Sequence, residues 1–155
     1  MTDVLRPYNL RPGEGEPIFF RGTKMVVKVD AFQSHGMFSL IEMTHPPDVG
    51  PALHIHPKGD EAFYVLDGHY SVQCGESTYE GTPGSFIFVP MGVGHNYKSG
   101  PNGGRVLVIS PAGLEGYFRE VSQQLSVRRV TLDEEREIAS RYGQEFLDMM
   151  KHWGQ

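Results

Sequence analysis

Short runs in which apolar and polar residues alternate fill the first two thirds of the chain and predict β-strands. Alternate side chains of a strand point to opposite faces, so such runs indicate strands with one buried face. Asp67-Gly68 lies between two runs and predicts a two-residue hairpin, because glycine tolerates the positive φ of that turn. Many short strands separated by turn residues favour a sandwich or a barrel. The expected strands are 17–20, 24–29, 37–43, 61–66, 69–74, 85–89 and 104–109.

The pattern changes after residue 110, where helical spacing replaces alternation. We expect a short helix over 114–125 and a second helix beginning at Thr131, which forms a capping box with Glu134. The second helix should pack an apolar stripe against the barrel or a partner subunit; a lid over a pocket is the alternative. The stripe is Ile138, Tyr142, Phe146, Met149 and Trp153.

These patterns divide the chain into three parts. Residues 1–16 are rich in proline, glycine and charge, and we expect an N-terminal arm there. The strands predict a β-barrel over 17–112, and the helices predict a C-terminal helical extension over 113–155.

Composition narrows the function classes. The chain has 155 residues, enough for one domain, with a net charge of −5 and no basic block, so nucleic acid is not an expected partner. One cysteine, Cys74, excludes an internal disulfide and a cysteine-based zinc site, and we expect it to be a small buried apolar residue. The chain shows neither a signal peptide nor an apolar run long enough for a membrane helix, so we expect a cytoplasmic protein that does not insert into a membrane.

Histidines concentrate in the strand-rich part: five of the seven lie between residues 45 and 95. His54 and His56 are two positions apart and should share one face of a strand. Glu61 begins the next strand, and His95 follows the turn at 90–94. If all four point into a barrel, a divalent cation would offset the cost of burying the carboxylate among apolar side chains. Imidazole and carboxylate suit Fe, Mn, Ni, Cu or Zn, and four protein ligands leave open positions for exogenous ligands.

The other histidines carry no predicted metal role. We expect His45 near the surface at a strand end, His69 facing solvent and His35 in a loop. His152 should lie near a helix C-terminus, where a positive charge complements the helix dipole.

Eight positions in this region resemble the two cupin motifs. His54, His56, Glu61 and Gly68 match H-x-H-x4-E-x6-G, and a second set matches G-x5-P-x-G-x2-H. The chain departs from the family pattern at Asp48, where glycine is usual, and at Ser99, where asparagine is usual. The resemblance implies an all-β cupin fold, a double-stranded β-helix or jelly-roll-type small barrel with C-terminal α-helices here, often found as a homodimer. It also implies that the metal ligands are His54, His56, Glu61 and His95. The second set is Gly84, Pro90, Gly92 and His95.

The segment 110–118 is similar to the strand-to-helix exit of quercetin 2,3-dioxygenase-like cupins. This resemblance implies a dioxygenase that binds a small aromatic or enediol-type substrate and dioxygen at the metal, with Glu61 as both ligand and general base. The alternatives are a non-catalytic small-molecule-binding or sensing cupin, and a metal-dependent isomerase or lyase of sugar-like or keto substrates. Alternation along the strands predicts that Phe38, Phe63, Phe86 and Tyr97 form walls of the pocket. Phe118, on the first expected helix, should cover the mouth of the pocket.

Overall fold

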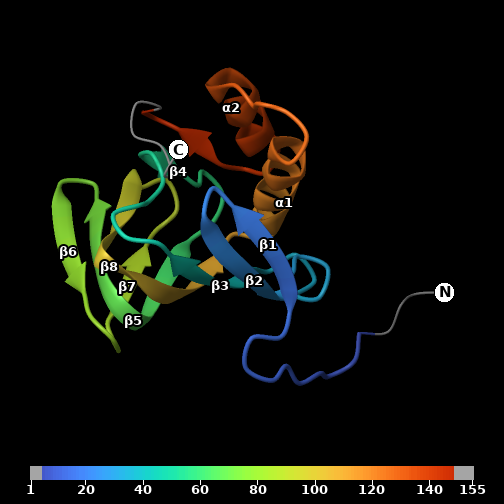
Figure 1. Cartoon of the computed structure of the whole chain (residues 1–155), viewed down its shortest axis with the longest axis horizontal. Coiled ribbons are helices and arrows are strands. Elements are labelled where there is room, and N and C mark those ends of the chain that lie inside the picture. Colours follow the sequence, from blue (N-terminus) through green and yellow to red (C-terminus); the bar gives the residue numbers. More distant parts are fainter. Residues whose placement is uncertain (1–4, 149–155) are drawn as a thin grey trace.

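The computed structural model describes residues 5–148, which form nine strands and two helices (Figure 1). Neither helix of this part of the chain is long and apolar enough to cross a membrane. The helices are α1 (Leu114–Leu125) and α2 (Leu132–Arg141). The strands are β1 (Glu16–Phe20), β2 (Thr23–Val29), β3 (Ser39–His45), β4 (His54–Ile55), β5 (Glu61–Cys74), β6 (Ser77–Gly81), β7 (Phe86–Val89), β8 (His95–Ser110) and β9 (Glu145–Phe146).

Two long antiparallel strands, β5 and β8, organise the barrel. They pair along most of their length, and different neighbours flank each half. The first half of β5 and the second half of β8 lie in a sheet ordered β1-β2-β3-β8-β5-β7. The other halves lie in a sheet ordered β9-β4-β8-β5-β6. The architecture is therefore the all-β cupin barrel that the sequence predicted, followed by two helices.

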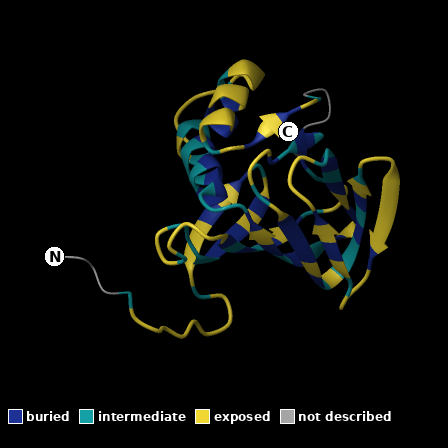
Figure 2. Ribbon diagram, turned by 180° about the vertical axis from the view of Figure 1, so that it is seen from behind, coloured by how far each residue is buried: buried dark blue, intermediate teal, exposed yellow. Residues whose placement is uncertain are grey.

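One hydrophobic core lies between the two sheets. Strand β3 shows how alternation builds it, because Ile41 and Met43 are buried while Thr44 between Met43 and His45 is exposed. Side chains from both sheets and from α1 join the same cluster, including Phe20, Val72 and Val121. Figure 2 shows this pattern as buried and exposed segments that follow one another along the strands.

The predicted hairpin at Asp67-Gly68 is wrong, since these residues lie within β5 and both flanking runs pair with β8. The ladder shifts register on both sides of Gly68, which has a φ of 75°. A β-carbon on Gly68 would lie 2.4 Å from the carbonyl oxygen of Gly103. A glycine with positive φ occurs in β-bulges as well as in turns. The expected positive φ at Gly68 is therefore correct, but it belongs to a bulge within β5 and not to a hairpin turn.

Three other strand predictions need correction. The run at 37–43 begins and ends two residues later, as β3, and β6 was not predicted. The run at 104–109 is only the end of β8, which begins at His95 and passes through a glycine-rich stretch. Glycine breaks strands in general, but here a β-carbon on Gly104 would lie 2.6 Å from the ring of Tyr70. The close approach of the Tyr70 ring, and not a turn, therefore explains the glycine at position 104.

The first helix has the predicted bounds, and the capping box of the second is confirmed: the Thr131 hydroxyl and the Glu134 carboxylate each accept a hydrogen bond from the other residue's backbone N–H. The apolar stripe does not continue as one helix. Helix α2 ends at Arg141, Gly143 takes a φ of 76°, and Phe146 lies in β9. Left-handed glycine after a helix is a common stop, and it redirects the chain towards β4. The predicted stripe positions Met149 and Trp153, and His152, lie outside the described residues.

Two buried glutamates attach the helices to the barrel. Glu135 of α2 accepts hydrogen bonds from the Arg21 guanidinium and the Tyr117 hydroxyl, each at 2.7 Å. Glu115 of α1 accepts one from the backbone N–H of Ala31 at 2.9 Å and a short one from the Ser39 hydroxyl. Both carboxylates are buried, so each has replaced its lost hydration with specific partners.

Candidate metal centre

The structure brings together the four predicted ligands at one end of the barrel. His54 lies on β4, His56 directly follows it, and Glu61 and His95 are the first residues of β5 and β8. One ligand atom from each lies within 4.8 Å of the others, and all four side chains are buried. Pairing of His54 with His95 across β4 and β8 joins positions 41 residues apart in the sequence.

Backbone carbonyls orient two of the imidazole rings. The Nδ1 atom of His54 lies 2.7 Å from the carbonyl oxygen of Ala52, and that of His95 lies 2.9 Å from the carbonyl oxygen of Val93. A carbonyl can only accept, so each Nδ1 carries a proton, and Nε2 is the nitrogen that presents a lone pair when the ring is neutral. Metal-binding histidines are commonly held in this way, with the second nitrogen donating to a carbonyl or carboxylate.

Glu61 lies between two of the histidines. Its Oε2 is 2.8 Å from Nε2 of His56, and its Oε1 is 3.4 Å from Nε2 of His95. Burial opposes ionisation of Glu61, but the charge and hydrogen bonding of His56 and His95 outweigh burial and hold the pKa of the carboxyl well below its usual range. Burial, reinforced by the neighbouring histidines, lowers the pKa of His54 to about 3. At neutral pH Glu61 is therefore ionised and His54 is neutral, the protonation states that bind a metal.

Several polar atoms of the cluster lack the partner that burial normally requires. Nε2 of His56, Nε2 of His95 and Oε2 of Glu61 are buried without a well-aligned hydrogen bond. Buried polar atoms left in this state cost about 1–3 kcal/mol each. A cation at their centre would pair with all of them, so the residues fit one divalent transition metal ion. Nitrogen and oxygen donors accept Fe, Mn, Ni, Cu and Zn alike, so the donor set leaves the metal's identity open.

A small cavity of about 20 Å³ lies beside His54 and Glu61. Three of the five predicted wall residues, Phe63, Tyr97 and Phe118, line it. The other two do not. Phe86 is 60% exposed on the outer face of β7, because alternation from the buried Ile87 turns it outward, and Phe38 lines a different pocket. The further lining residues, which the sequence did not reveal, are Met43, Pro51, Val108, Leu114 and Gln144.

His45 is buried, so the prediction of a surface position is wrong. Strand β3 extends to His45, and alternation from Ile41 and Met43 directs its ring inward. Its Nδ1 lies 2.8 Å from the Tyr70 hydroxyl and its Nε2 lies 3.1 Å from the Tyr97 hydroxyl. His45 therefore supports the back of Tyr97, which lines the metal cavity. Extending the predicted alternation by two residues beyond Met43 would have predicted that His45 is buried.

His45 should make stability depend on pH. Burial lowers its pKa from an ordinary 6.5 to about 3, so between these values the unfolded chain binds a proton that the folded chain does not. Stability from this site is thus present above pH 6.5 and is lost on acidification, by up to about 1.4 kcal/mol per pH unit. In urea unfolding at pH 7, 6 and 5, His45→Gln should lose stability less steeply than wild type. His69→Gln should follow wild type, and equal slopes in all three proteins would contradict the assignment.

The remaining described histidines and the cysteine lie away from the cluster or at its edge. His35 lies in an exposed loop, and the His69 side chain is 44% exposed with Nε2 2.9 Å from the Glu80 carboxylate. The predictions of a loop position for His35 and of solvent exposure for His69 are confirmed. Cys74 is only partly buried and packs against the core.

Comparison with known proteins agrees with this geometry. The family described as "Cupin domain" matches residues 41–110, which contain all four clustered residues. The chain therefore contains a cupin domain. Among curated proteins, quercetin 2,3-dioxygenase of Bacillus subtilis is 27% identical over 92 residues. That alignment covers 59% of this cupin but only 27% of the relative, so the chain matches about a quarter of the longer protein.

Solved structures with the same fold include proteins of differing description. An RmlC-like cupin from Shewanella frigidimarina has a TM-score of 0.59 at 19% identity, covering 72% of this chain and 96% of its own. The polyketide cyclase RemF from Streptomyces resistomycificus has a TM-score of 0.59 at 24% identity, covering 68% and 80%. KdgF from Halomonas has a TM-score of 0.58 at 15% identity, covering 68% and 94%. At sequence identities of 15–24%, this similarity shows a shared fold alone.

Proposed function

We propose that this cupin is a metal-dependent dioxygenase acting on a small aromatic or enediol-type substrate. The observation that carries the proposal is the buried cluster of three histidines and one glutamate beside a cavity with aromatic walls. Four protein ligands leave one or two positions of a five- or six-coordinate metal for a substrate oxygen and dioxygen. The similarity to a quercetin 2,3-dioxygenase over 92 residues supports this choice among cupin activities.

The residues of the site have distinct tasks in this proposal. His54, His56, His95 and Glu61 would hold the metal, which would supply Lewis acidity towards a substrate hydroxyl and redox chemistry towards dioxygen. Glu61 is ionised, and one of its oxygens can accept the proton of that hydroxyl. Phe63 and Phe118, both buried, bound the cavity with apolar rings.

Oxygen consumption tests the proposal directly. Protein loaded separately with Fe, Mn, Ni or Cu should consume dioxygen in the presence of a flavonol or an enediol and form an oxygenated product. Product formed without oxygen uptake would instead favour a metal-dependent isomerase or lyase of sugar-like or keto substrates. Tight binding with no product would favour a non-catalytic sensing cupin. Either result would overturn the dioxygenase assignment.

Glu61→Gln should lower turnover about 10²–10⁴-fold, because the amide keeps the shape of the side chain but cannot accept the hydroxyl proton. Initial rates of oxygen uptake should be compared at equal metal content, measured by inductively coupled plasma mass spectrometry. Glu80→Gln, at an exposed glutamate outside the cluster, provides the matched control. Unchanged turnover in a metal-loaded Glu61→Gln protein would remove the base role.

A further inference from the structure

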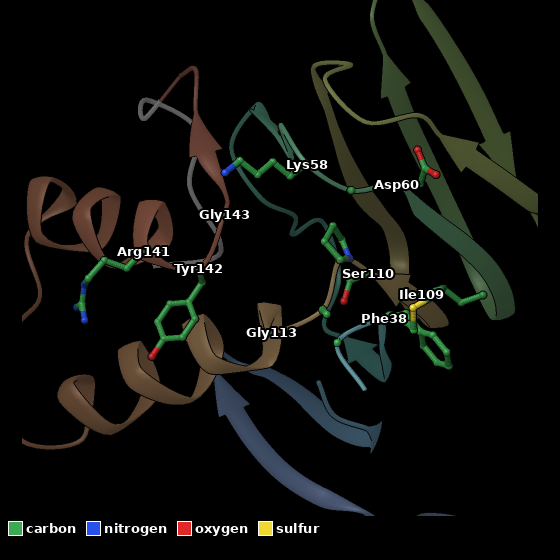
Figure 3. A pocket seen from close by; sticks show the side chains of 14 residues that line it. Phe38, Lys58, Asp60, Ile109, Ser110, Gly113, Arg141, Tyr142 and Gly143 are labelled. Atoms are coloured by element: carbon green, nitrogen blue, oxygen red, sulfur yellow. The ribbon is translucent and has the colours of Figure 1, made fainter. Parts of the chain in front are cut away.

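Two cavities lie on either side of a thin wall. The larger, of about 550 Å³, is drawn in Figure 3, and its exposed lining residues Met37 and Phe38 open it to solvent. The smaller is the metal cavity of about 20 Å³, which has room for roughly one water molecule and not for an aromatic substrate. Three pairs of consecutive residues contribute one member to each cavity. These pairs are Asp60 and Glu61, Gly113 and Leu114, and Gly143 and Gln144.

One part of the wall is held by few bonds. We call residues 143–148 the strap. It contains β9, whose ladder with β4 has only two residue pairs. The backbone N–H groups of Leu147 and Asp148 donate to the carbonyl of Leu53 at 2.8 and 3.3 Å, and that of Gln144 donates to the carbonyl of Ala139 at 3.0 Å. At its start, Gly143 has a φ of 76°, and a β-carbon there would meet no atom within 4 Å. The strap inserts Phe146 into the core against Tyr117, so opening must withdraw that ring, but its ladder is short and pairs with neither β5 nor β8.

The strap also brings an unpaired polar group to the metal cavity. Gln144 is 3% exposed, lines the cavity together with His54 and Glu61, and its Oε1 has no hydrogen-bond partner. A buried amide oxygen without a partner is costly and uncommon in native proteins. A ligand hydroxyl in the cavity would supply the missing donor.

We propose that Gln144 is a substrate-binding residue, and that the strap opens at Gly143 to admit the substrate from the pocket of Figure 3. The substrate class, which rests on the proposed function, is a planar phenol or enol with a free hydroxyl next to the group that reaches the metal. That hydroxyl donates a hydrogen bond to Oε1 of Gln144 in the widened cavity of the substrate-bound state.

The outer pocket suits such a molecule. Phe38 and Ile109 lie on one side of it and Tyr142 and Gly143 on the other, as Figure 3 shows. Phe38 and Ile109 are 38% and 43% exposed, so they offer apolar surface to a flat ring. The polar end of the same molecule would face the wall that contains Asp60 and Gly143, behind which lie Glu61 and Gln144.

A reversible lock tests the strap without relying on turnover. Ile55 and Glu145 are paired across β4 and β9, so Ile55→Cys/Glu145→Cys places two thiols opposite each other. The metal-loaded protein is exposed to increasing dipicolinate, a small chelator, before and after reduction. With the disulfide formed, we expect metal removal at least about tenfold slower and nearly independent of chelator concentration, with full recovery on reduction.

The single variant Glu145→Cys, treated with the same oxidant, controls for effects of oxidation and of Cys74. Peptide mapping without reduction identifies the 55–145 bond. Equal removal rates in the locked and reduced protein would overturn the strap as the entrance. This result concerns the metal alone, so it holds whether or not the protein is a dioxygenase.

Anaerobic calorimetry with quercetin, and with flavone as a probe lacking the hydroxyls, tests Gln144. Gln144→Met keeps the volume but removes the acceptor, and should weaken quercetin binding about fivefold to tenfold while leaving flavone binding unchanged. Gln123→Met, at an exposed glutamine of α1, should match wild type. Equal weakening of both probes would mean a packing role and overturn the assignment. Failure of quercetin to bind wild type would contradict the proposed function and the role of Gln144, while the chelator result would still decide the strap.

Discussion

His54→Ala/His56→Ala should bind essentially no metal, whereas wild type dialysed without chelator should carry about one ion per chain. The two substitutions remove adjacent donors from a cluster whose ligand atoms all lie within 4.8 Å of one another. Loss of a residue that only supports a ligand costs ~10–100-fold in metal affinity, so loss of two direct ligands should cost more than about 100-fold. Inductively coupled plasma mass spectrometry of tag-free protein measures the difference.

The control for this experiment is His69→Ala, which removes a half-exposed histidine outside the cluster. It should retain the metal content of wild type. If the double variant kept its metal, or if wild type took up none after loading with each of Fe, Mn, Ni, Cu and Zn, the metal assignment would be wrong. The identity of the bound metal also bears on the class of reaction, because zinc would favour isomerase or lyase chemistry over oxygen chemistry.

Glu135→Ala should lower the free energy of unfolding by about 3–5 kcal/mol, a large share of the total for a domain of this size. Glu135 is 0% exposed and accepts hydrogen bonds from Arg21 on the barrel and Tyr117 on α1. Its removal leaves a guanidinium that is 13% exposed without its carboxylate partner. Chemical denaturation measures the loss, and Glu137→Ala, at an exposed position of the same helix, should change stability by less than about 0.5 kcal/mol. Similar values for the two variants would show that this carboxylate does not hold α2 to the barrel.

The candidate metal site could be predicted from the sequence because its ligands follow local rules. His54 and His56 share a face by simple alternation, and turns of fixed length lead to Glu61 and His95. The spacing of eight motif positions then indicated the fold as well as the cluster. Their meeting in space follows from the pairing of β4 with β8, which a resemblance implies and periodicity alone does not.

Where the prediction was wrong, the missing information was not local. Gly68 carries the same positive φ in a hairpin and in a bulge, and only the pairing of both flanking runs with β8 distinguishes the two. Gln144 was missed for a related reason. The apolar spacing of Ile138, Tyr142 and Phe146 suggested one continuous helix, although Gly143 offered a stop signal inside it.

The course of β8 also has a consequence for the order of events as the chain folds. This strand contributes His95 at its first residue and pairs with β3, β4 and β5, whose residues lie between 39 and 74. Such distant pairings form late, because the chain must lose the entropy of closing a long loop before the strand contacts can compensate for that loss. The four donors therefore come together only once the barrel has closed, so a metal ion should bind the finished fold instead of nucleating it. Metal uptake during refolding should accordingly lag behind, or coincide with, the recovery of barrel structure.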